Sequence, residues 1–515
     1  MIDSVIRNFV IIAIAFVMAD GALADAPSPL ADGQKEFNSS NAIATNYVRP
    51  LIFVQITDVH ICDAAGKKIL EKLIGREGTI DPEPFVNATA KDIVDLHPDF
   101  VVATGDLVVE ARGSSPRDIL GTYKLYNRSM QPLINAGIPF YPVIGNHDVV
   151  GVFNKSVDVN ESGYGKSLFQ QIFNQNSTYY SFDEGGYHFI ALDPNSYELW
   201  NATTMVSNFF VSEPQMAWLE ADLNSTSKPT IVFLHEPTVD LINRDELLAV
   251  LRAHNVKMIF SGHWHVNDLL NSGGIPEQVT TALSGAWWMG TDITGVPGGY
   301  MVVALNGSDI DTFYRYTGVS MQINIIEPAE PVVSKRLDIK AQIWSDLPVQ
   351  SAYVSLDGGQ GKQMNLTRLG PWYEAQDSID LGNFIQGYHM ANITASGENN
   401  STISKSFSFK VTDDAFVPIG EMLTHWETYL GKHPWIKGYA NTTQNLTKIE
   451  AGMQPVFRDE TGAIPYLQEY CPPLSTGEND TQLMARGLLE KYDVTTNSSV
   501  FVIQRDDACP EKVAA

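Results

Sequence analysis

The sequence contains few cysteines, few basic residues and no long apolar run beyond its first 24 residues. Three cysteines in 515 residues are too few for a disulfide-built fold. The 34 lysine and arginine residues are outnumbered by 60 aspartate and glutamate residues, so the formal net charge is −26. A surface of that sign repels polyanions, which argues against nucleic acid and acidic membranes as partners. No stretch after residue 24 predicts a transmembrane span.

The three cysteines fall in two separate regions of the sequence. Cys471 and Cys509 lie in the same C-terminal region, where they either pair or stay reduced. Cys62 follows the run "TDVH". A buried thiol is expected at Cys62, with a metal-bound thiolate as the less favoured alternative.

The N-terminal 24 residues predict export. Arg7 precedes the apolar run "FVIIAIAFVMA", and "ALA" at residues 22–24 supplies small residues for cleavage. This pattern is typical of a secretory signal peptide, and an uncleaved N-terminal anchor is the alternative. N-x-S/T acceptors recur from Asn38 to Asn497, which predicts a glycosylated, secreted or cell-surface protein. An unmodified polar surface would also explain these acceptors.

A chain of this length predicts about three domains. Residues 25–46 are rich in Pro, Ser and Asn and are expected to form a linker. Between residues 47 and 320, short apolar runs such as "LIFVQITD", "DFVVATGD" and "TIVFLHE" alternate with helical segments such as "RDELLAVLRAHN". Apolar runs of this length suit strands buried on both faces, so the segment predicts a layered α/β domain.

The C-terminal residues have a different pattern. From 321 to 412, runs such as "RLDIKAQIWS" and "KSFSFKVTD" alternate apolar and polar residues. Period-two alternation predicts an all-β, immunoglobulin-like sandwich. Residues 413–515 combine a helix-like start with later strands, and they are expected to form a small OB-like barrel.

Polar residues stand at the ends of five of the apolar runs in residues 47–320. Layered α/β proteins place ligands at the carboxyl ends of their strands. Each residue alone has an ordinary explanation as a turn, cap or core side chain, but five successive strand ends predict a shared site. The residues are Asp58 and His60, Asp106, Asn146 with His147 and Asp148, His235, and His263 with His265.

The residue types predict two divalent or trivalent transition-metal ions, of Mn, Fe, Zn or Ni, because carboxylate, imidazole and amide oxygen all bind such ions. Two ions about 3.5–4 Å apart can hold a bridging hydroxide and polarise a phosphoryl oxygen for in-line attack. Hydrolysis of a small phosphomonoester or phosphodiester is therefore the expected reaction.

Five blocks of the sequence resemble the calcineurin-like metallophosphoesterases. The blocks D-x-H, G-D, G-N-H-D/E, H and G-H-x-H occur in order as "DVH", "GD", "GNHD", the histidine of "FLHEP" and "GHWH". Their order is similar to that of the class III cyclic-nucleotide phosphodiesterases. The resemblance covers about residues 47–318 and implies a β-sandwich of two sheets flanked by helices.

The resemblance also implies roles, position by position. Asp106 would bridge the two ions, and His147 would assist the leaving group as proton donor or oxyanion stabiliser, with Asp148 orienting it. One ion would be bound by Asp58, His60 and His265, and the other by Asn146, His235 and His263.

Some residues depart from the patterns of related subgroups. Purple acid phosphatases place a tyrosine where this chain has Val109, so their tyrosinate-to-iron charge transfer is not expected. Glu236 follows the fourth-block histidine, where class III phosphodiesterases often have a second histidine, which leaves a nucleotide substrate open. For Trp264, and for Trp287 and Trp288, packing is favoured over a role in lining the site.

Two other functions remain open. A cell-surface binding protein would use the C-terminal β modules on a surface polymer or glycan and keep a vestigial phosphoesterase fold. The complete set of ligand residues argues against this alternative. A nuclease conflicts with export and with the negative charge.

Overall fold

The computed structural model describes residues 49–412, except 63–66, 68–79, 110, 201–207, 293, 329–331, 334–335 and 383, and beyond 412 only Thr428 and seven strands. The signal peptide and linker expected in residues 1–46 lie outside the described residues, as do Cys471 and Cys509. Among the described residues, no helix combines the length and apolar character needed to cross a bilayer.

The first sheet begins with the apolar run "LIFVQI" at Leu51–Ile56. Its five strands lie in the order β11-β10-β1-β2-β3, with β1, β2 and β3 parallel and β10 antiparallel to β1. Phe53 pairs with Phe100 across β1 and β2. The strands are β1 (Leu51–Ile56), β2 (Phe100–Thr104), β3 (Phe140–Val143), β10 (Gly299–Asn306) and β11 (Asp309–Tyr316).

A second sheet of six strands has the order β4-β5-β6-β7-β9-β8. Strands β5, β6, β7 and β9 are parallel, and β4 and β8 are antiparallel edge strands. The strands are β4 (Tyr180–Glu184), β5 (Tyr187–Ala191), β6 (Thr230–Phe233), β7 (Val256–Ser261), β8 (Asp268–Ser272) and β9 (Ile275–Val279).

The two sheets pack face to face around an aromatic core. Because side chains alternate along a strand, Phe53 points into this core while Val54 points to the outer face. The rings of Phe53 and Phe233, from opposite sheets, meet edge to face at 5.6 Å. The central strands β1, β2, β5 and β6 are buried on both faces, which explains why the sequence shows continuous apolar runs there.

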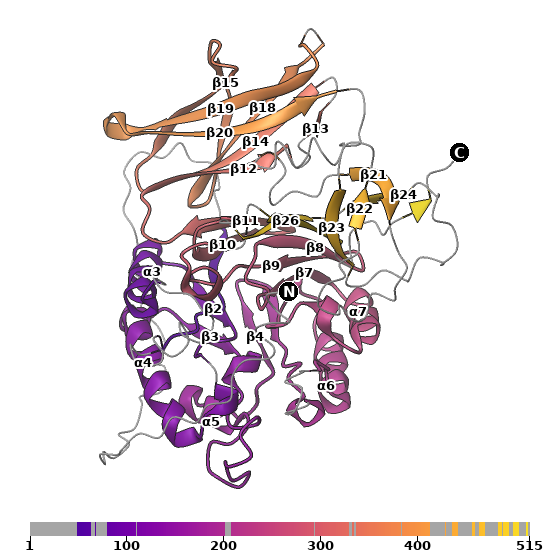
Figure 1. Cartoon of the computed structure of the whole chain (residues 1–515). Helices are drawn as coiled ribbons and strands as arrows, with labels where there is room; N and C mark the ends of the chain where they lie inside the picture. Colours follow the sequence, from indigo (N-terminus) through magenta and orange to yellow (C-terminus); the bar gives the residue numbers. More distant parts are fainter. Residues whose placement is uncertain are drawn as a thin grey trace.

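Helices cover both outer faces of the sandwich. Figure 1 shows α3 (Pro82–Leu96) and α4 (Pro116–Asn135) on one side, and α6 (Glu213–Asn224) and α7 (Arg244–Arg252) on the other. Asp81 caps α3 by accepting from the Glu83 N–H at 3.1 Å. The short α5 (Ser167–Phe173) and the 3-10 turns η1 (Ala111–Gly113), η2 (Asn146–Asp148), η3 (Tyr197–Leu199), η4 (Thr238–Asp240) and η5 (Ala286–Trp288) complete the layer. The expected two-sheet sandwich flanked by helices is confirmed.

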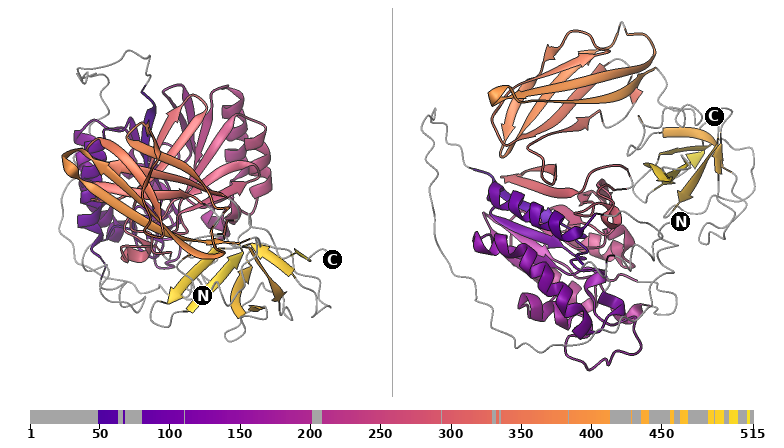
Figure 2. Two further views of the ribbon diagram at one scale, coloured as in Figure 1. Left: turned by 90° about the horizontal axis from the view of Figure 1, so that it is seen from above. Right: turned by 60° about the vertical axis from the view of Figure 1, so that its left-hand side comes forward.

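Residues 321–411 form two further sheets that share one apolar core. Their orders are β12-β14-β18-β17 and β13-β20-β19-β15-β16, and Figure 2 shows them as two layers above the helical part. The expected β structure is present, whereas the immunoglobulin assignment stays a prediction. The elements are β12 (Met321–Glu327), β13 (Val332–Val333), β14 (Arg336–Ser345), β15 (Val349–Leu356), β16 (Lys362–Gln363), β17 (Asn365–Leu369), β18 (Trp372–Asp380), β19 (Gly387–Gly397), η6 (Glu398–Asn400) and β20 (Thr402–Val411).

This second sandwich packs on the first sheet through aromatic side chains. The ring of Phe313 on β11 lies 5.6 Å from that of Trp344 and 5.5 Å from that of Trp372. The guanidinium of Arg315 lies 4.2 Å from the centre of the Trp344 ring. All three aromatic side chains are buried, so the two parts share a continuous core.

The remaining strands form a sheet in the order β25-β26-β23-β22-β21-β24-β27. The OB-like barrel predicted for residues 413–515 stays a prediction. These strands are β21 (Trp435–Ala440), β22 (Val456–Arg458), β23 (Ala463–Gln468), β24 (Leu483–Arg486), β25 (Leu488–Asp493), β26 (Ser498–Ile503) and β27 (Glu511–Lys512).

Candidate metal centre

The predicted site residues meet where the carboxyl ends of the two sheets come together. Strand β1 leads to Asp58 and His60, β2 to Asp106, β3 to η2 with Asn146, His147 and Asp148, β6 to His235, and β7 to His263 and His265. All are buried except His263, which is partly exposed. The structure thus brings together every residue that the sequence placed at a strand end.

Five of these residues have a left-handed backbone. The φ angles are 49° for Asp58, 44° for His60, 53° for Asp106, 66° for His263 and 57° for His265. This region is unfavourable for residues with a Cβ atom, and residues held there occur at sites where function fixes their geometry. The turns after β1, β2 and β7 therefore aim side chains at one point at the expense of local stability.

Glycines in the motif blocks allow this close approach. A Cβ atom on Gly105 would lie 2.6 Å from the ring of His235, and one on Gly145 would collide with the carboxylate of Asp106. A Cβ atom on Gly262 would collide with Thr57 and lie 2.5 Å from Asp58 Oδ2. A residue with a Cβ atom would therefore not fit at the glycines of "GD", "GNHD" and "GHWH".

One oxygen of the Asp58 carboxylate accepts hydrogen bonds, and the other has no hydrogen-bond partner among the described residues. Oδ2 accepts hydrogen bonds from the Thr57 hydroxyl at 2.8 Å and from the His263 N–H at 2.9 Å. Oδ1 is buried and has no hydrogen-bond partner among the described residues. It lies 3.1 Å from His265 Nε2 and 3.7 Å from His60 Nε2. The side-chain atoms next to Oδ1 are therefore imidazole nitrogens, which also offer lone pairs.

His235, on the other side of the site, likewise has one side-chain atom in a hydrogen bond and one without a hydrogen-bond partner among the described residues. Its Nδ1 lies 2.7 Å from the Thr104 carbonyl oxygen, so Nδ1 carries the proton and donates. Its Nε2 then faces Asp106 Oδ2 at 3.1 Å. Asp106 Oδ1 accepts from the His147 N–H at 2.7 Å. Oδ2 alone faces both His235 and, at 3.7 Å, His60, so a single oxygen points to both halves of the site.

The ligand atoms form overlapping groups with spacings suited to metal ions. Asp58, His60 and His265 form one group and Asp106, His235 and His263 another, each with its ligand atoms within 4.8 Å of one another. A third group, of His60, Asp106 and His147, lies between them. His/Asp groups of this kind fit first-row transition metals.

The protonation states of Asp58, His60 and His263 also fit metal binding. Although burial opposes ionisation, the charges of His235 and His265 lower the pKa of Asp58 to about 2. Burial lowers the pKa of His60 to about 4, and burial and His235 lower that of His263 to about 3. Carboxylates are then ionised and these imidazoles neutral, as metal ligands must be.

Asn146 is the amide residue that the sequence assigned to the second group. It lies on η2 and is buried, and its Oδ1 has no hydrogen-bond partner among the described residues. A buried amide oxygen without a partner costs free energy unless something binds it. Asn146 therefore fits the neutral ligand that the sequence assigned to this position.

His147 contacts an arginine that sequence reasoning missed. Arg112, on η1, donates from Nη2 to His147 Nε2 at 2.9 Å. Burial and then the Arg112 guanidinium hold the pKa of His147 well below its ordinary value of 6.5. Arg112 lies six residues after Asp106, outside the motif blocks. The sequence therefore offered no sign of its contact with His147, which depends on the turn between β2 and α4.

Asp148, which the sequence assigned to orienting His147, accepts hydrogen bonds from backbone N–H groups of two turns. Its Oδ1 accepts from the Leu107 N–H at 3.0 Å and its Oδ2 from the Gly145 N–H at 2.9 Å. The Tyr123 hydroxyl donates to its backbone carbonyl at 3.1 Å. Asp148 therefore joins the turn after β2 to the turn after β3, and it positions Asp106 and His147 through their backbones.

Comparison with known proteins identifies the family. Residues 51–267 match the calcineurin-like phosphoesterases. This part of the chain belongs to that family. Purple acid phosphatase 23 of Arabidopsis thaliana is 27% identical over 169 residues, which span 28% of this chain and 32% of that relative. The serine/threonine-protein phosphatase CPPED1 of Mus musculus is 27% identical over 297 residues, 52% of this chain and 83% of the relative. A dimetal phosphatase from Danio rerio is 16% identical with a TM-score of 0.39, covering 52% of this chain and 97% of that one.

The tryptophans around the calcineurin-like site differ in role. Trp264 packs against Val239, Leu270 and Val279, as expected, and its Nε1 donates to Asp240 at 2.7 Å. Trp288 is buried with Cys62 and Val109. Trp287 instead stacks on His60, with ring centroids 4.9 Å apart. Packing was favoured for both residues of this pair, and it holds for Trp288 alone.

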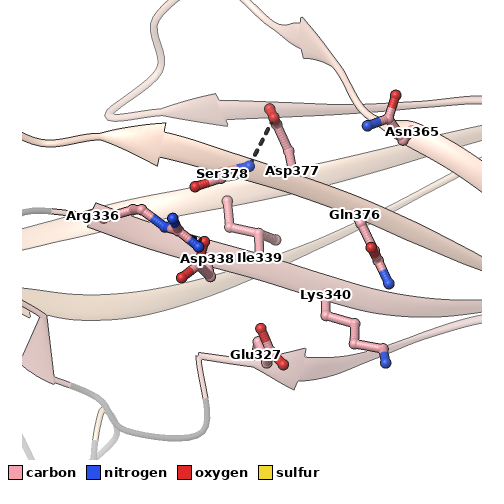
Figure 3. A pocket seen from close by; sticks show the side chains of 9 residues that line it. All are labelled: Glu327, Arg336, Asp338, Ile339, Lys340, Asn365, Gln376, Asp377 and Ser378. Atoms are coloured by element: carbon pink, nitrogen blue, oxygen red, sulfur yellow. Dashed lines mark hydrogen bonds and ion pairs between the residues drawn. The ribbon is translucent and has the colours of Figure 1, made fainter.

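A polar hollow also occurs on the second sandwich. Figure 3 shows it across β14 and β18, with the Asp377 carboxylate accepting from the Ser378 N–H at 2.8 Å. None of the calcineurin-like site residues lines it. Its residues include Glu327, Arg336, Asp338, Lys340, Gln376 and Ser378.

Proposed function

We propose that the protein is an exported phosphoester hydrolase that uses two transition-metal ions of Mn, Fe, Zn or Ni. The observation that carries the proposal is the set of buried ligand atoms that face one another without hydrogen-bond partners, foremost Asp58 Oδ1 and the Nε2 of His235, within the described residues. One ion would be held by Asp58, His60 and His265, and the other by Asn146, His235 and His263, with Asp106 Oδ2 facing both.

When bound, two such ions polarise a phosphoryl oxygen and activate water for in-line attack. The chain's own residues would orient and stabilise the reacting group. Arg112 and His147 lie side by side, and because His147 Nε2 accepts from Arg112, Nδ1 carries the proton that a neutral His147 would donate to a phosphoryl or leaving oxygen. Of the two roles predicted for His147, donating to an anionic oxygen agrees better with its lowered pKa, because a neutral imidazole can do so.

The substrate is proposed to be a small phosphoester, either a monoester or a diester. The cell-surface binding alternative is less favoured, because every ligand residue is present and converges on one point. Export, glycosylation and surface contacts of the C-terminal modules are proposals supported by the N-terminal sequence, the acceptor asparagines and the β structure.

The test is hydrolysis of 4-nitrophenyl phosphate and bis(4-nitrophenyl) phosphate by the purified chain, reconstituted separately with Mn, Zn, Fe and Ni. The Asp106→Asn variant is the control, because asparagine keeps an oxygen that can accept from the His147 N–H. Turnover by the native chain that is lost in this variant supports the proposal. No turnover with any metal, although two ions are bound per chain, would contradict it.

A further inference from the structure

Trp287 covers the histidines of the calcineurin-like site. Its ring centroid lies 4.9 Å from that of His60, with the planes 26° apart, 5.0 Å from His265 and 5.7 Å from His147. Unlike its neighbour Trp288, which is 1% exposed, Trp287 keeps part of its surface open. A large aromatic ring therefore lies against the site and is itself partly exposed.

The backbone holds Trp287 in this position with strain. Trp287 and Trp288 have φ angles of 47° and 59°. The turn is fixed by the Ala286 N–H, which donates to the Thr291 carbonyl at 2.9 Å, and by Trp288 Nε1, which donates to the His60 carbonyl at 3.2 Å. Two consecutive bulky residues in this region are costly and typical of ligand-binding segments. Simple packing would not need this conformation.

A row of buried aromatic side chains connects Arg112 with His263. The guanidinium of Arg112 lies 5.3 Å from the Phe153 ring centre, and Phe153 lies 5.6 Å from Trp200. Trp200 is 6.4 Å from Phe209, whose ring meets that of His263 at 5.3 Å. We call Phe153, Trp200 and Phe209 the aromatic wall. It runs from the Arg112–His147 contact to His263.

Exposed apolar side chains flank this wall. Leu199, beside Trp200, is 49% exposed, and Ile242, whose N–H donates to the Phe209 carbonyl at 2.9 Å, is 63% exposed. Large apolar side chains exposed beside a polar site are suited to apolar ligand surface. This arrangement suits a ligand with an apolar part next to its phosphoryl group.

We propose that Trp287 forms a leaving-group subsite that selects phosphoesters of planar, aromatic alcohols. The proposal rests on the function proposed above. In the reaction, the oxygen of water bonds to phosphorus, the bond from phosphorus to the aryl oxygen breaks, and the aryl alcohol leaves with one proton of that water. A leaving oxygen beside His147 places its ring within stacking distance of Trp287, because stacked rings have centroids about 4.5–7 Å apart.

The test measures binding as well as turnover. Phenylphosphonate and methylphosphonate, which are not hydrolysed, are titrated by calorimetry into the metal-reconstituted full chain and its Trp287→Leu and Trp287→Phe variants. Trp218→Leu is the matched control, because Trp218 is partly exposed on α6, where it packs against Tyr179. Hydrolysis of phenyl phosphate and of glycerol 2-phosphate is compared for the same proteins.

Trp287→Leu should weaken phenylphosphonate about tenfold, as expected for loss of one aromatic stack, and leave methylphosphonate unchanged. Trp287→Phe should retain most of the affinity, and Trp218→Leu all of it. An equal loss of affinity for both phosphonates in Trp287→Leu would overturn the subsite. Native protein that does not bind phenylphosphonate more tightly than methylphosphonate would also overturn it. Selective binding without hydrolysis of either ester would instead contradict the proposed function and leave the subsite standing.

Discussion

The Nε2 atom of His235 faces the Oδ2 atom of Asp106 at 3.1 Å, with no hydrogen available from a neutral imidazole to join them. The Nδ1 proton of His235 is already donated to the Thr104 carbonyl. Only a cation between the two atoms makes this contact favourable. Although burial opposes protonation, the carboxylates of Asp106 and Asp58 raise the pKa of His235 well above its ordinary value. The same geometry therefore attracts a proton or a metal ion.

Metal removal should destabilise the phosphoesterase part of the chain. Ligands that bind only the folded state add about 2.7 kcal/mol at one hundred times their dissociation constant. Thermal unfolding of chelator-treated protein, repeated after addition of Mn or Zn, should show a rise in midpoint with metal. In Asp106→Asn the rise should be much smaller, and an equal rise would contradict the assigned site.

His147→Ala should separate catalysis from metal binding. Metal content, measured by mass spectrometry, should stay near the native value, because His147 is not needed by either ion. Turnover should fall by roughly 10²-fold to 10³-fold, the usual range for loss of one hydrogen-bond donor to an anionic oxygen. Loss of both metals from this variant, with retention by Asp106→Asn, would reverse the role assignment.

Arg112→Ala should weaken transition-state binding of the phosphoryl group. Hydrogen bonds to charged groups contribute about 1.5–3 kcal/mol, so kcat/KM should fall by about tenfold to hundredfold. Arg128→Ala is the matched control, because Arg128 lies on α4 and its side chain is 70% exposed. Equal kcat/KM in both variants would show that the contact of Arg112 with His147 is structural only.

Gly145→Ala should destabilise the protein, whereas Gly121→Ala should stabilise it. The added methyl at residue 145 would collide with Asp106, so that variant should lose metal and activity. At residue 121, inside α4, a Cβ atom meets nothing within 4 Å, and alanine should stabilise the helix by about 0.5–1 kcal/mol. Metal content and thermal midpoints of the two variants give the comparison.

Asp148→Ala should destabilise the fold and impair the site together. It leaves the buried N–H groups of Leu107 and Gly145 without their acceptor, and each such group costs about 1–3 kcal/mol. The thermal midpoint and the metal content should both fall. Retention of native stability with a loss of turnover alone would instead favour the predicted role of Asp148 in orienting His147.

Local patterns were enough to predict the sheets and the strand-end residues. A run such as "LIFVQI" is apolar because both faces of β1 are covered, and the polar residues that follow it meet their counterparts at the edge of the sheets. Arg112 and Trp287 could not be placed in this way. Arg112 reaches His147 across 35 positions of sequence, and Trp287 reaches His60 from a separate turn. Such contacts depend on how turns close, which periodicity does not encode.

The pairing of β10 with β1 means that the family match does not coincide with a folding unit. The match ends at residue 267, yet Gly299–Asn306 hydrogen-bonds along Leu51–Gln55 in the centre of the first sheet. Excision at residue 267 would turn β1 into an open edge and invite aggregation. Excision at residue 320 would keep β10 and β11 but uncover Phe313. A stable fragment is therefore expected to extend through the second sandwich.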